Sequence, residues 1–282
     1  MEEAKNLKIM QQVADRLGIG IHEVHMELEK VMRWMQPVRR QMPVVSDDGN
    51  IQTMEVTRQG IGPLNTKFGK FWEMSFEVGD RWSKYHALVM ADLDSHSGLP
   101  VFKNKEEIVV RTDSGCVTGQ VFADTTCDCE AQLHLAQEEI SHAGEGIVVH
   151  IPHQDGRGMG LPFKLGTLQL QDALGVNTVE AARLLAYDGS IDVRTYEGVV
   201  AVLKFLGISD QTMINLVTNN PKKVDALEMN GYRVINTPAV VKGHEHISHH
   251  LAAKADGLGH NYGVFRPRIS PETVNLEAVD LP

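Results

Sequence analysis

The feature that most constrains the fold is a regular succession of strand-like and helix-like segments after residue 68. Apolar or alternating runs typical of strands occupy residues 68–78, 85–93, 106–113, 146–152, 212–220 and 232–238. Apolar residues at helical spacing occupy residues 129–144, 161–174, 177–187, 196–207 and 221–231. Strands that alternate with helices pack as a sheet with helices on its faces. The sequence therefore predicts an α/β fold with a mixed sheet flanked by helices.

The first 60 residues have a different pattern. Residues 2–40 predict two amphipathic helices, the second ended by Pro37. Residues 41–62 contain the turn-rich strings DDGN and QGIGP, which indicate a linker. The chain becomes irregular after about residue 240. We therefore expect a helical extension and linker over 1–60, an α/β domain over 61–262 and a C-terminal tail over 263–282.

Charge and hydropathy limit the expected partners. The 282-residue chain carries a formal net charge of -10, which disfavours a general nucleic-acid or anionic-membrane binder. No apolar run approaches the ~20 residues that cross a bilayer, and the start lacks a secretory apolar region. We expect a cytoplasmic protein without nucleic-acid or membrane partners. A local cationic pocket for one phosphorylated small molecule remains compatible with this composition.

The three cysteines of the chain are close together in sequence. Cys116, Cys127 and Cys129 form the pattern C-x10-C-x-C. Residues two apart in extended chain point to the same side, so Cys127 and Cys129 can bind one ion. Three thiolates leave the fourth position of a tetrahedral zinc open, as in catalytic sites. Two alternatives stay open: a structural zinc completed by His134 or His153, and three unrelated buried thiols.

A glycine-rich string, GRGMGLP, follows the strand-like run 146–152. Glycines at a strand end let backbone approach a ligand closely. Arg157 would then present its planar guanidinium to a phosphate or a purine edge. The alternative is a simple tight turn.

Two further polar strings carry charge at loop positions. Asp192 and Arg194 face one way in extended chain, either toward a ligand or as a surface ion pair. In TNNPKK, Thr218 and the first amides of a helix form an anion site, to which Lys222 and Lys223 add charge. We infer that Arg111, Arg157, Arg194, Lys222 and Lys223 gather in one cationic pocket.

Taken together, these strings resemble the GTP cyclohydrolase II family over residues 62–260. RTDSGCVTGQVF and CDCEAQL resemble R-x-H-S-E-C-x-T-G-D and C-D-C-x-x-Q-L, and QDGRGMGL resembles Q-E-G-R-G-I-G-L. LQDALGVNTVEA resembles L-Q-D-x-G-x-D-T-V-E-A, and LVTNNPKKVDAL resembles L-L-T-N-N-P-x-K-x-x-x-L. HLAAKADGLGH follows the closing Y-L-x-T-K-x-x-K-M-G-H.

The resemblance implies a reaction and a set of site residues. GTP would be hydrolysed to a diaminopyrimidinone ribotide phosphate, formate and pyrophosphate, the entry to riboflavin synthesis. Zinc, one per subunit, would be held by Cys116, Cys127 and Cys129, with Mg²⁺ on the triphosphate and a homodimer as the assembly. Asp192 would accept a proton, and Arg194 would act at the α-phosphate as nucleophile or as a clamp. Nucleotide contacts would come from Arg111, Ser114, Gln132, Asp155, Gly156, Arg157, Thr178, Thr218 and Lys223.

Three positions depart from the family pattern. Leu168 stands where the family string K-x-R-A-Y-x-L-Q-D has tyrosine, Gly115 replaces a glutamate, and Asp155 replaces another. Loss of a hydrogen-bonding group from a catalytic site costs rate. The departures are either tolerated drift or a sign of altered chemistry, namely ring opening without loss of formate or a different nucleotide. A zinc-stabilised protein that binds nucleotide without turnover is the non-enzymatic alternative.

Overall fold

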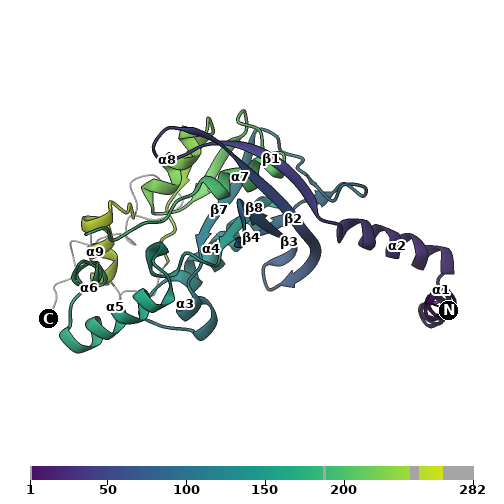
Figure 1. Cartoon of the computed structure of the whole chain (residues 1–282), viewed down its shortest axis with the longest axis horizontal. Coiled ribbons are helices and arrows are strands. Elements are labelled where there is room, and N and C mark those ends of the chain that lie inside the picture. Colours follow the sequence, from purple (N-terminus) through teal and green to yellow (C-terminus); the bar gives the residue numbers. More distant parts are fainter. Residues whose placement is uncertain (1, 187–188, 242–247, 263–282) are drawn as a thin grey trace.

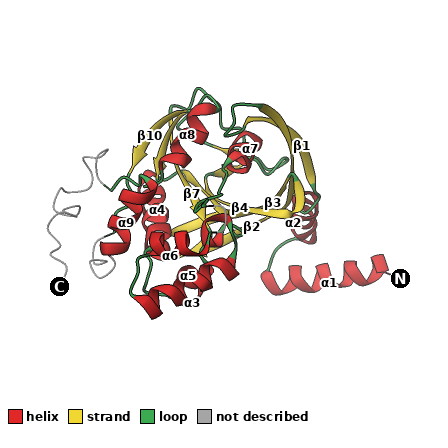
Figure 2. Cartoon of the chain, turned by 60° about the vertical axis from the view of Figure 1, so that its left-hand side comes forward, coloured by secondary structure: helices red, strands yellow, loops and turns green. Residues whose placement is uncertain are grey.

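The structure is a computed structural model that describes residues 2–186, 189–241 and 248–262. Within that part, eight strands form one sheet in the order β1-β2-β3-β4-β8-β7-β9-β10, and β5 and β6 form a small hairpin. The fold is mixed α/β, as predicted, with helices against both faces of the curled sheet (Figures 1 and 2). The strands are β1 (Val38–Val45), β2 (Ile51–Thr66), β3 (Gly69–Val78), β4 (Asp80–Met90), β5 (Asp92–Leu93), β6 (Pro100–Val101), β7 (Glu107–Ser114), β8 (Gly146–Ile151), β9 (Met213–Val217) and β10 (Arg233–Thr237).

The helices follow the predicted order, with two additions. They are α1 (Glu2–Leu17), α2 (Ile21–Trp34), α3 (Val117–Phe122), α4 (Cys129–Ala143), α5 (Leu161–Leu174), α6 (Thr178–Leu185), α7 (Glu197–Phe205), α8 (Pro221–Met229) and α9 (Ser248–Leu258). A 3-10 turn covers Asp155–Gly158. Among these, α3 and α9 are the additions. Within the described residues, no helix has the length and apolar character needed to cross a membrane.

The strand pairing changes from antiparallel to parallel at the centre of the sheet. From β1 to β8 each neighbouring pair is antiparallel, whereas β8, β7, β9 and β10 run parallel. Larger apolar core residues lie between the sheet and α7, including Phe76, Leu203 and Phe205. On the opposite face, Ile140 of α4 packs with Val148 in a smaller apolar cluster. Both faces of the parallel half are therefore covered, as parallel strands require.

Two sequence-based expectations are wrong. Residues 41–62 are not a linker, because β1 and β2 pair in register and belong to the main sheet. DDGN forms the turn between them, and QGIGP lies inside β2 beside a β-bulge after Arg58. Glycine and proline are tolerated at bulges and in edge strands. Residues after 240 are not uniformly irregular, since α9 covers Ser248–Leu258. The predicted tail, 263–282, lies outside the described residues.

The N-terminal helices lie at one end of the molecule, away from α5, α6 and α9 (Figure 1). Trp34, at the end of α2, is buried and meets Trp72 of β3 edge to face at 5.6 Å. Apolar side chains such as Leu28 and Met32 remain exposed along α2. The two predicted helices are confirmed, and Trp34 joins them to the sheet.

Candidate functional site

The polar strings of the sequence meet at the carboxyl ends of three neighbouring parallel strands. β7 ends at Ser114, β8 at Ile151 and β9 at Val217, and their loops open on the same edge of the sheet. Ligands of open α/β sheets bind at this edge. The three loops line one pocket, which α5 and α9 also border.

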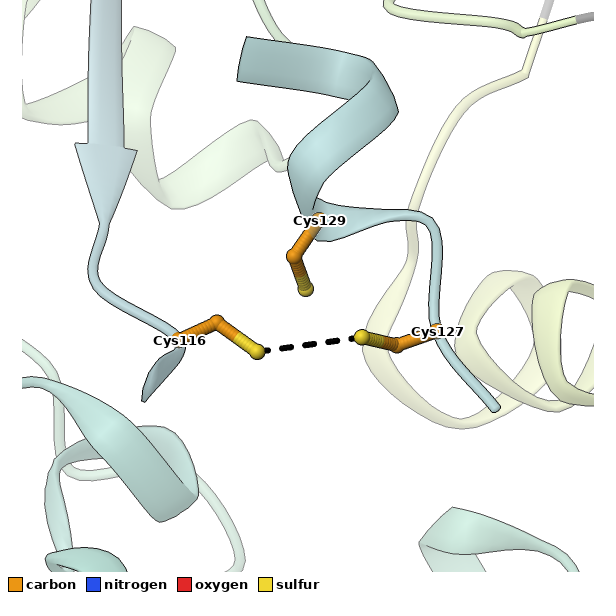
Figure 3. Close-up of side chains that lie close together, drawn as sticks. All are labelled: Cys116, Cys127 and Cys129. Carbon is orange, nitrogen blue, oxygen red and sulfur yellow. Dashed lines mark hydrogen bonds between the residues drawn. The ribbon is translucent and has the colours of Figure 1, made fainter. Parts of the chain in front are cut away.

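The side chains of the three cysteines point toward one another just after β7, as Figure 3 shows. Cys116 directly precedes α3, Cys129 is the first residue of α4, and Cys127 lies two residues earlier. The Cys116 and Cys127 sulfurs are 3.7 Å apart, and all three sulfurs lie within 4.8 Å of one another. Zinc–sulfur bonds of about 2.3 Å in tetrahedral geometry place sulfurs ~3.8 Å apart. The donor set and spacing therefore fit one zinc ion.

This geometry bears on the alternatives for the cysteines. The thiols are not unrelated, since they form one group. Among the described residues, no histidine shares that group. His134 lies against Phe68 at a tilt, with ring centres 5.2 Å apart, and His153 meets Tyr85 edge to face at 5.4 Å. The protein thus offers three ligands, the number typical of a catalytic zinc.

A lysine stabilises negative charge on the cluster. Lys164 of α5 donates hydrogen bonds to the Cys116 sulfur at 2.8 Å and to Asp155 at 3.2 Å. Hydrogen bonds from Cys127 and Cys129, and then the Lys164 charge, hold the pKa of Cys116 well below its usual value. The neighbouring Cys116 raises the pKa of Cys127 to about 11. One thiolate is thus already favoured before a cation binds the others.

Two arginines of the predicted set line the pocket, Arg111 buried and Arg157 partly buried. Arg111 is 4% exposed and donates to the Val217 carbonyl at 3.1 Å and to Gln132 at 3.1 Å. Arg157 donates to the Thr178 hydroxyl at 3.0 Å. Burial, and then the charge of Arg194, lower the pKa of Arg157 to about 10. These like charges in one pocket favour an anionic ligand.

The glycine-rich loop brings Arg157 against the loop that carries Asp192 and Arg194. Arg157 has φ 58°, a left-handed conformation, and its carbonyl accepts a hydrogen bond from Val193 at 3.0 Å. A Cβ at Gly158 would lie 3.1 Å from the Arg194 nitrogen. The glycine is therefore needed for close approach of the two loops. GRGMGLP is more than a tight turn, because it positions Arg157 against Thr178.

Arg194 lines the pocket and Asp192 lies behind it. The Arg194 guanidinium donates to both carboxylate oxygens of Asp192, through Nε at 2.8 Å. Although burial opposes it, the hydrogen bond to Asp192 raises the pKa of Arg194 above its ordinary value. The side chain is thus held as a cation. Lys222 points elsewhere: its ammonium donates to the Asp192 carbonyl at 3.1 Å, outside the pocket lining.

Lys223 supplies a further buried basic group. Its ammonium donates to the Thr112 carbonyl at 2.8 Å, and its side chain is 5% exposed. Burial, followed by the charges of Arg111 and Arg194, sets the pKa of Lys223 well below its ordinary value. The other predicted contacts that line the same pocket are Ser114, Gln132, Asp155, Gly156, Thr178 and Thr218. Every predicted site residue except Asp192 and Lys222 therefore lines this one pocket.

Two of the three departures have a packing explanation. A Cβ at Gly115 would lie 2.8 Å from the Ile151 carbonyl oxygen and 2.9 Å from Pro152 Cα, so only glycine fits without moving β8. Asp155 accepts from the Val117 amide at 3.1 Å and from Lys164 at 3.2 Å. Both carboxylate oxygens of Asp155 are thus engaged in fixing the cysteine loop and Lys164.

Leu168, the third departure, does not line the main pocket. It is half-buried on α5 and borders a smaller neighbouring hollow with Cys127 and Lys164. A longer side chain at this position would start beside the sulfur cluster. The structure gives no packing reason for leucine here.

Sequence reasoning missed several pocket residues. Lys164, Lys254, His260 and Tyr262 all line the pocket. Signals existed for three of them, since Lys164 is the first residue of the KLGTLQLQD string, and Lys254 and His260 fall at the Lys and final His of the closing string. Tyr262 lies beyond every string and had no signal.

Several buried polar atoms of the pocket have no partner within the protein. Among the described residues, four buried side-chain atoms of this pocket have no hydrogen-bond partner: Arg111 Nε, Asp128 Oδ1, Arg157 Nη1 and His260 Nε2. A buried polar atom without a partner is costly. The pocket is thus built to hydrogen-bond a polar, predominantly anionic molecule.

Comparison with known proteins agrees with this picture. The family model described as GTP cyclohydrolase II matches residues 58–238. GTP cyclohydrolase-2 of Helicobacter hepaticus is 38% identical over 200 residues, which cover 70% of this chain and 94% of that protein. Riboflavin biosynthesis protein RibBA of Endomicrobium trichonymphae is 35% identical over 193 residues, which cover 66% of this chain but 46% of that protein. The chain therefore spans about half of this longer relative.

A solved structure shows a weaker likeness. It is RibBX, a two domain 3,4-dihydroxy-2-butanone 4-phosphate synthase from A. baumannii, with a TM-score of 0.31 and 17% identity. The likeness covers 80% of this chain and 48% of that one.

Proposed function

The chain belongs to the GTP cyclohydrolase II family, and from that premise we propose that it hydrolyses a purine nucleoside triphosphate, GTP in the first instance. The products are a diaminopyrimidinone ribotide phosphate, formate and pyrophosphate, the entry step of riboflavin synthesis. One observation carries the proposal. Three thiols that fit zinc and four basic side chains, Arg111, Arg157, Arg194 and Lys223, line one pocket.

We propose that Cys116, Cys127 and Cys129 hold one zinc ion, and that Mg²⁺ accompanies the triphosphate. When bound, zinc would lower the pKa of a water molecule, which could then attack the imidazole carbon of the base. Lys164 keeps the Cys116 sulfur ionised and fixes its direction through a 2.8 Å hydrogen bond. Asp155 in turn orients Lys164, so its proposed role changes from a purine contact to support of the sulfur cluster.

At the other end of the pocket, we assign Arg194 to the α-phosphate as a clamp. A guanidinium that is held ionised by Asp192 cannot supply a lone pair, which disfavours the nucleophile role. A charge-assisted contact stabilises the negative charge that develops as pyrophosphate departs. Asp192 then acts as a positioning residue for Arg194, rather than as a proton acceptor. Arg157 and Lys223 extend the same cationic surface.

The proposed unit of activity is the part of the chain from β1 to the end of the described residues. This boundary is supported by β1 and β2, which belong to the main sheet, so we propose that the catalytic domain begins near Val38. A homodimer, implied by the family resemblance, is also proposed. Light scattering of the purified chain at several concentrations measures the assembly directly.

A second reaction is favoured by one observation. Leu168 and Cys127 line the same hollow. Leucine at this position lacks the phenol of the tyrosine in the family string. Ring opening without release of formate is the reaction expected if that phenol is needed for the later hydrolytic step.

Incubation of the zinc- and Mg²⁺-loaded chain with GTP, followed by separation of nucleotides, formate and pyrophosphate, tests the proposal. Formate and pyrophosphate in equal amounts support the main proposal. Ring-opened nucleotide without formate supports the second reaction. Unchanged GTP that nevertheless binds would show a nucleotide-binding protein without turnover, and unchanged GTP without binding would contradict GTP as the ligand. Cys127→Ser serves as the control, because loss of one thiol removes the zinc site.

A further inference from the structure

We infer that the C-terminal segment 248–262 completes the substrate pocket, and that His260 contacts the phosphate chain of the nucleotide through Nε2. The identity of the ligand rests on the proposed function. The inference itself stands on how this segment is held and on what His260 faces.

The segment is fixed to three elements that surround the pocket. At α6, a Cβ on Gly257 would lie 2.8 Å from Val179 Cγ1, so the two helices are in close contact. At the β9 loop, the Asn261 amide donates to the Asn219 carbonyl at 2.9 Å. At α4, the Lys254 ammonium lies 3.6 Å from Asp128, which is 3% exposed. These attachments hold the segment across the pocket.

The hydrogen-bonding state of His260 follows from its neighbour. The Tyr262 hydroxyl lies 3.4 Å from Nδ1 of His260. Burial, the largest cause, raises the pKa of Tyr262 to about 12, so its hydroxyl keeps its proton and can donate to Nδ1. When Tyr262 donates, the hydrogen of the neutral imidazole is carried by Nε2, and this is the tautomer that we infer. That atom is buried, has no partner and belongs to the pocket lining.

The charges around His260 select the kind of ligand. The side chains that act on it are Lys254 of α9, Lys223 of α8 and Arg194 before α7, with the Asp192 carboxylate opposing them. Arg194 and Lys223 are also the cations that we assign to the phosphates. A donor among these cations suits a phosphate oxygen and not the edge of the base. His260 is therefore placed at the phosphate end of the pocket.

Binding of two probes to the zinc-loaded full chain tests the inference. Inorganic triphosphate reports the phosphate end, and guanosine reports the base end. His260→Ala is expected to weaken triphosphate binding by about tenfold or more, the cost of one charge-assisted hydrogen bond. His260→Gln, which retains a donor near Nε2, is expected to weaken it less. His142→Ala, at an exposed position on α4, is the matched control and should leave both probes unaffected.

Guanosine affinity separates a contact from a merely structural effect. The inference predicts that His260→Ala leaves guanosine binding within about twofold of the wild type. Unchanged triphosphate affinity, or an equal loss for both probes, would overturn it. If the alanine variant fails to fold, nitrogen NMR of the wild-type histidines decides, because triphosphate must shift the His260 Nε2 signal. Wild-type protein that shows this contact but releases neither formate nor pyrophosphate from GTP would contradict the proposed function alone.

Discussion

At the residue scale, the space for a metal ion is set by a glycine in α3. A Cβ at Gly119 would lie 2.7 Å from the Cys127 sulfur and 3.2 Å from the Cys116 sulfur. The string CVTGQ therefore supplies both a ligand and the room for its partners. Gly119 was part of the family string in the sequence, but its role is visible only in three dimensions.

Gly119→Ala is expected to weaken zinc binding by about 10- to 100-fold, because the added methyl group displaces the Cys127 sulfur. Competition with a chromogenic chelator measures the affinity. Gly62→Ala is the control, since a Cβ at Gly62 meets nothing within 4 Å. Equal zinc affinities for the two variants would show that the sulfur cluster tolerates the methyl group.

Leu168→Tyr is the second prediction at this scale. If the missing phenol limits the last hydrolytic step, tyrosine beside Cys127 should raise formate release relative to ring opening by about tenfold or more. Product analysis on the same GTP incubation gives this ratio. An unchanged ratio would show that Leu168 has no part in the chemistry.

At the scale of elements, sequence patterns predicted most of the strands and helices but not the start of the sheet. The run 68–78 corresponds to β3, and the run 177–187 to α6, which Asn177 and Glu180 cap with a capping box. β1 and β2 were missed because their turn and bulge residues look like a linker. α9 was missed because Gly257 and weak amphipathicity hide a helix whose stability comes from packing on α6.

Truncation tests the corrected boundary. Removal of residues 1–20 deletes α1 and is expected to change the melting temperature by only a few degrees, because the sheet and Trp34 stay intact. Removal of residues 1–60 deletes β1 and most of β2, including the buried Val44 and Val56. We expect this shorter chain to show no cooperative thermal transition by circular dichroism. A folded, active 61–282 fragment would restore the linker interpretation.

At the scale of the whole molecule, parallel strands explain why distant strings form one site. Sequence motifs identified the β7, β8 and β9 loops, and their meeting follows from strand order alone. The partners of each side chain could not be predicted. The pairing of Asp192 with Arg194 and the engagement of Asp155 by Lys164 depend on contacts between loops far apart in sequence.

The burial of His260 by the fold makes the stability of the protein depend on pH. Burial, followed by the charges of Lys254 and Arg194, lowers the pKa of His260 from 6.5 to about 3. The unfolded chain then binds a proton at this residue that the folded chain refuses. The contribution of His260 to stability is therefore full above pH 6.5 and declines as the pH falls toward 3.

His260→Gln should accordingly reduce the loss of stability between pH 7 and pH 5, by about 2 kcal/mol relative to the wild type. Urea unfolding at pH 7, 6 and 5 gives the free energies of unfolding. His142→Gln, at an exposed site, should keep the wild-type slope. Parallel curves for the wild type and His260→Gln would show that this imidazole is not held neutral by the fold.

X-ray absorption at the zinc edge of the loaded protein tests the central claim most directly. The account predicts three sulfur neighbours at about 2.3 Å and one lighter neighbour that is exchangeable with solvent. A fourth sulfur, the scattering pattern of a bound imidazole, or fewer than three sulfurs around the ion would contradict an open zinc site at Cys116, Cys127 and Cys129.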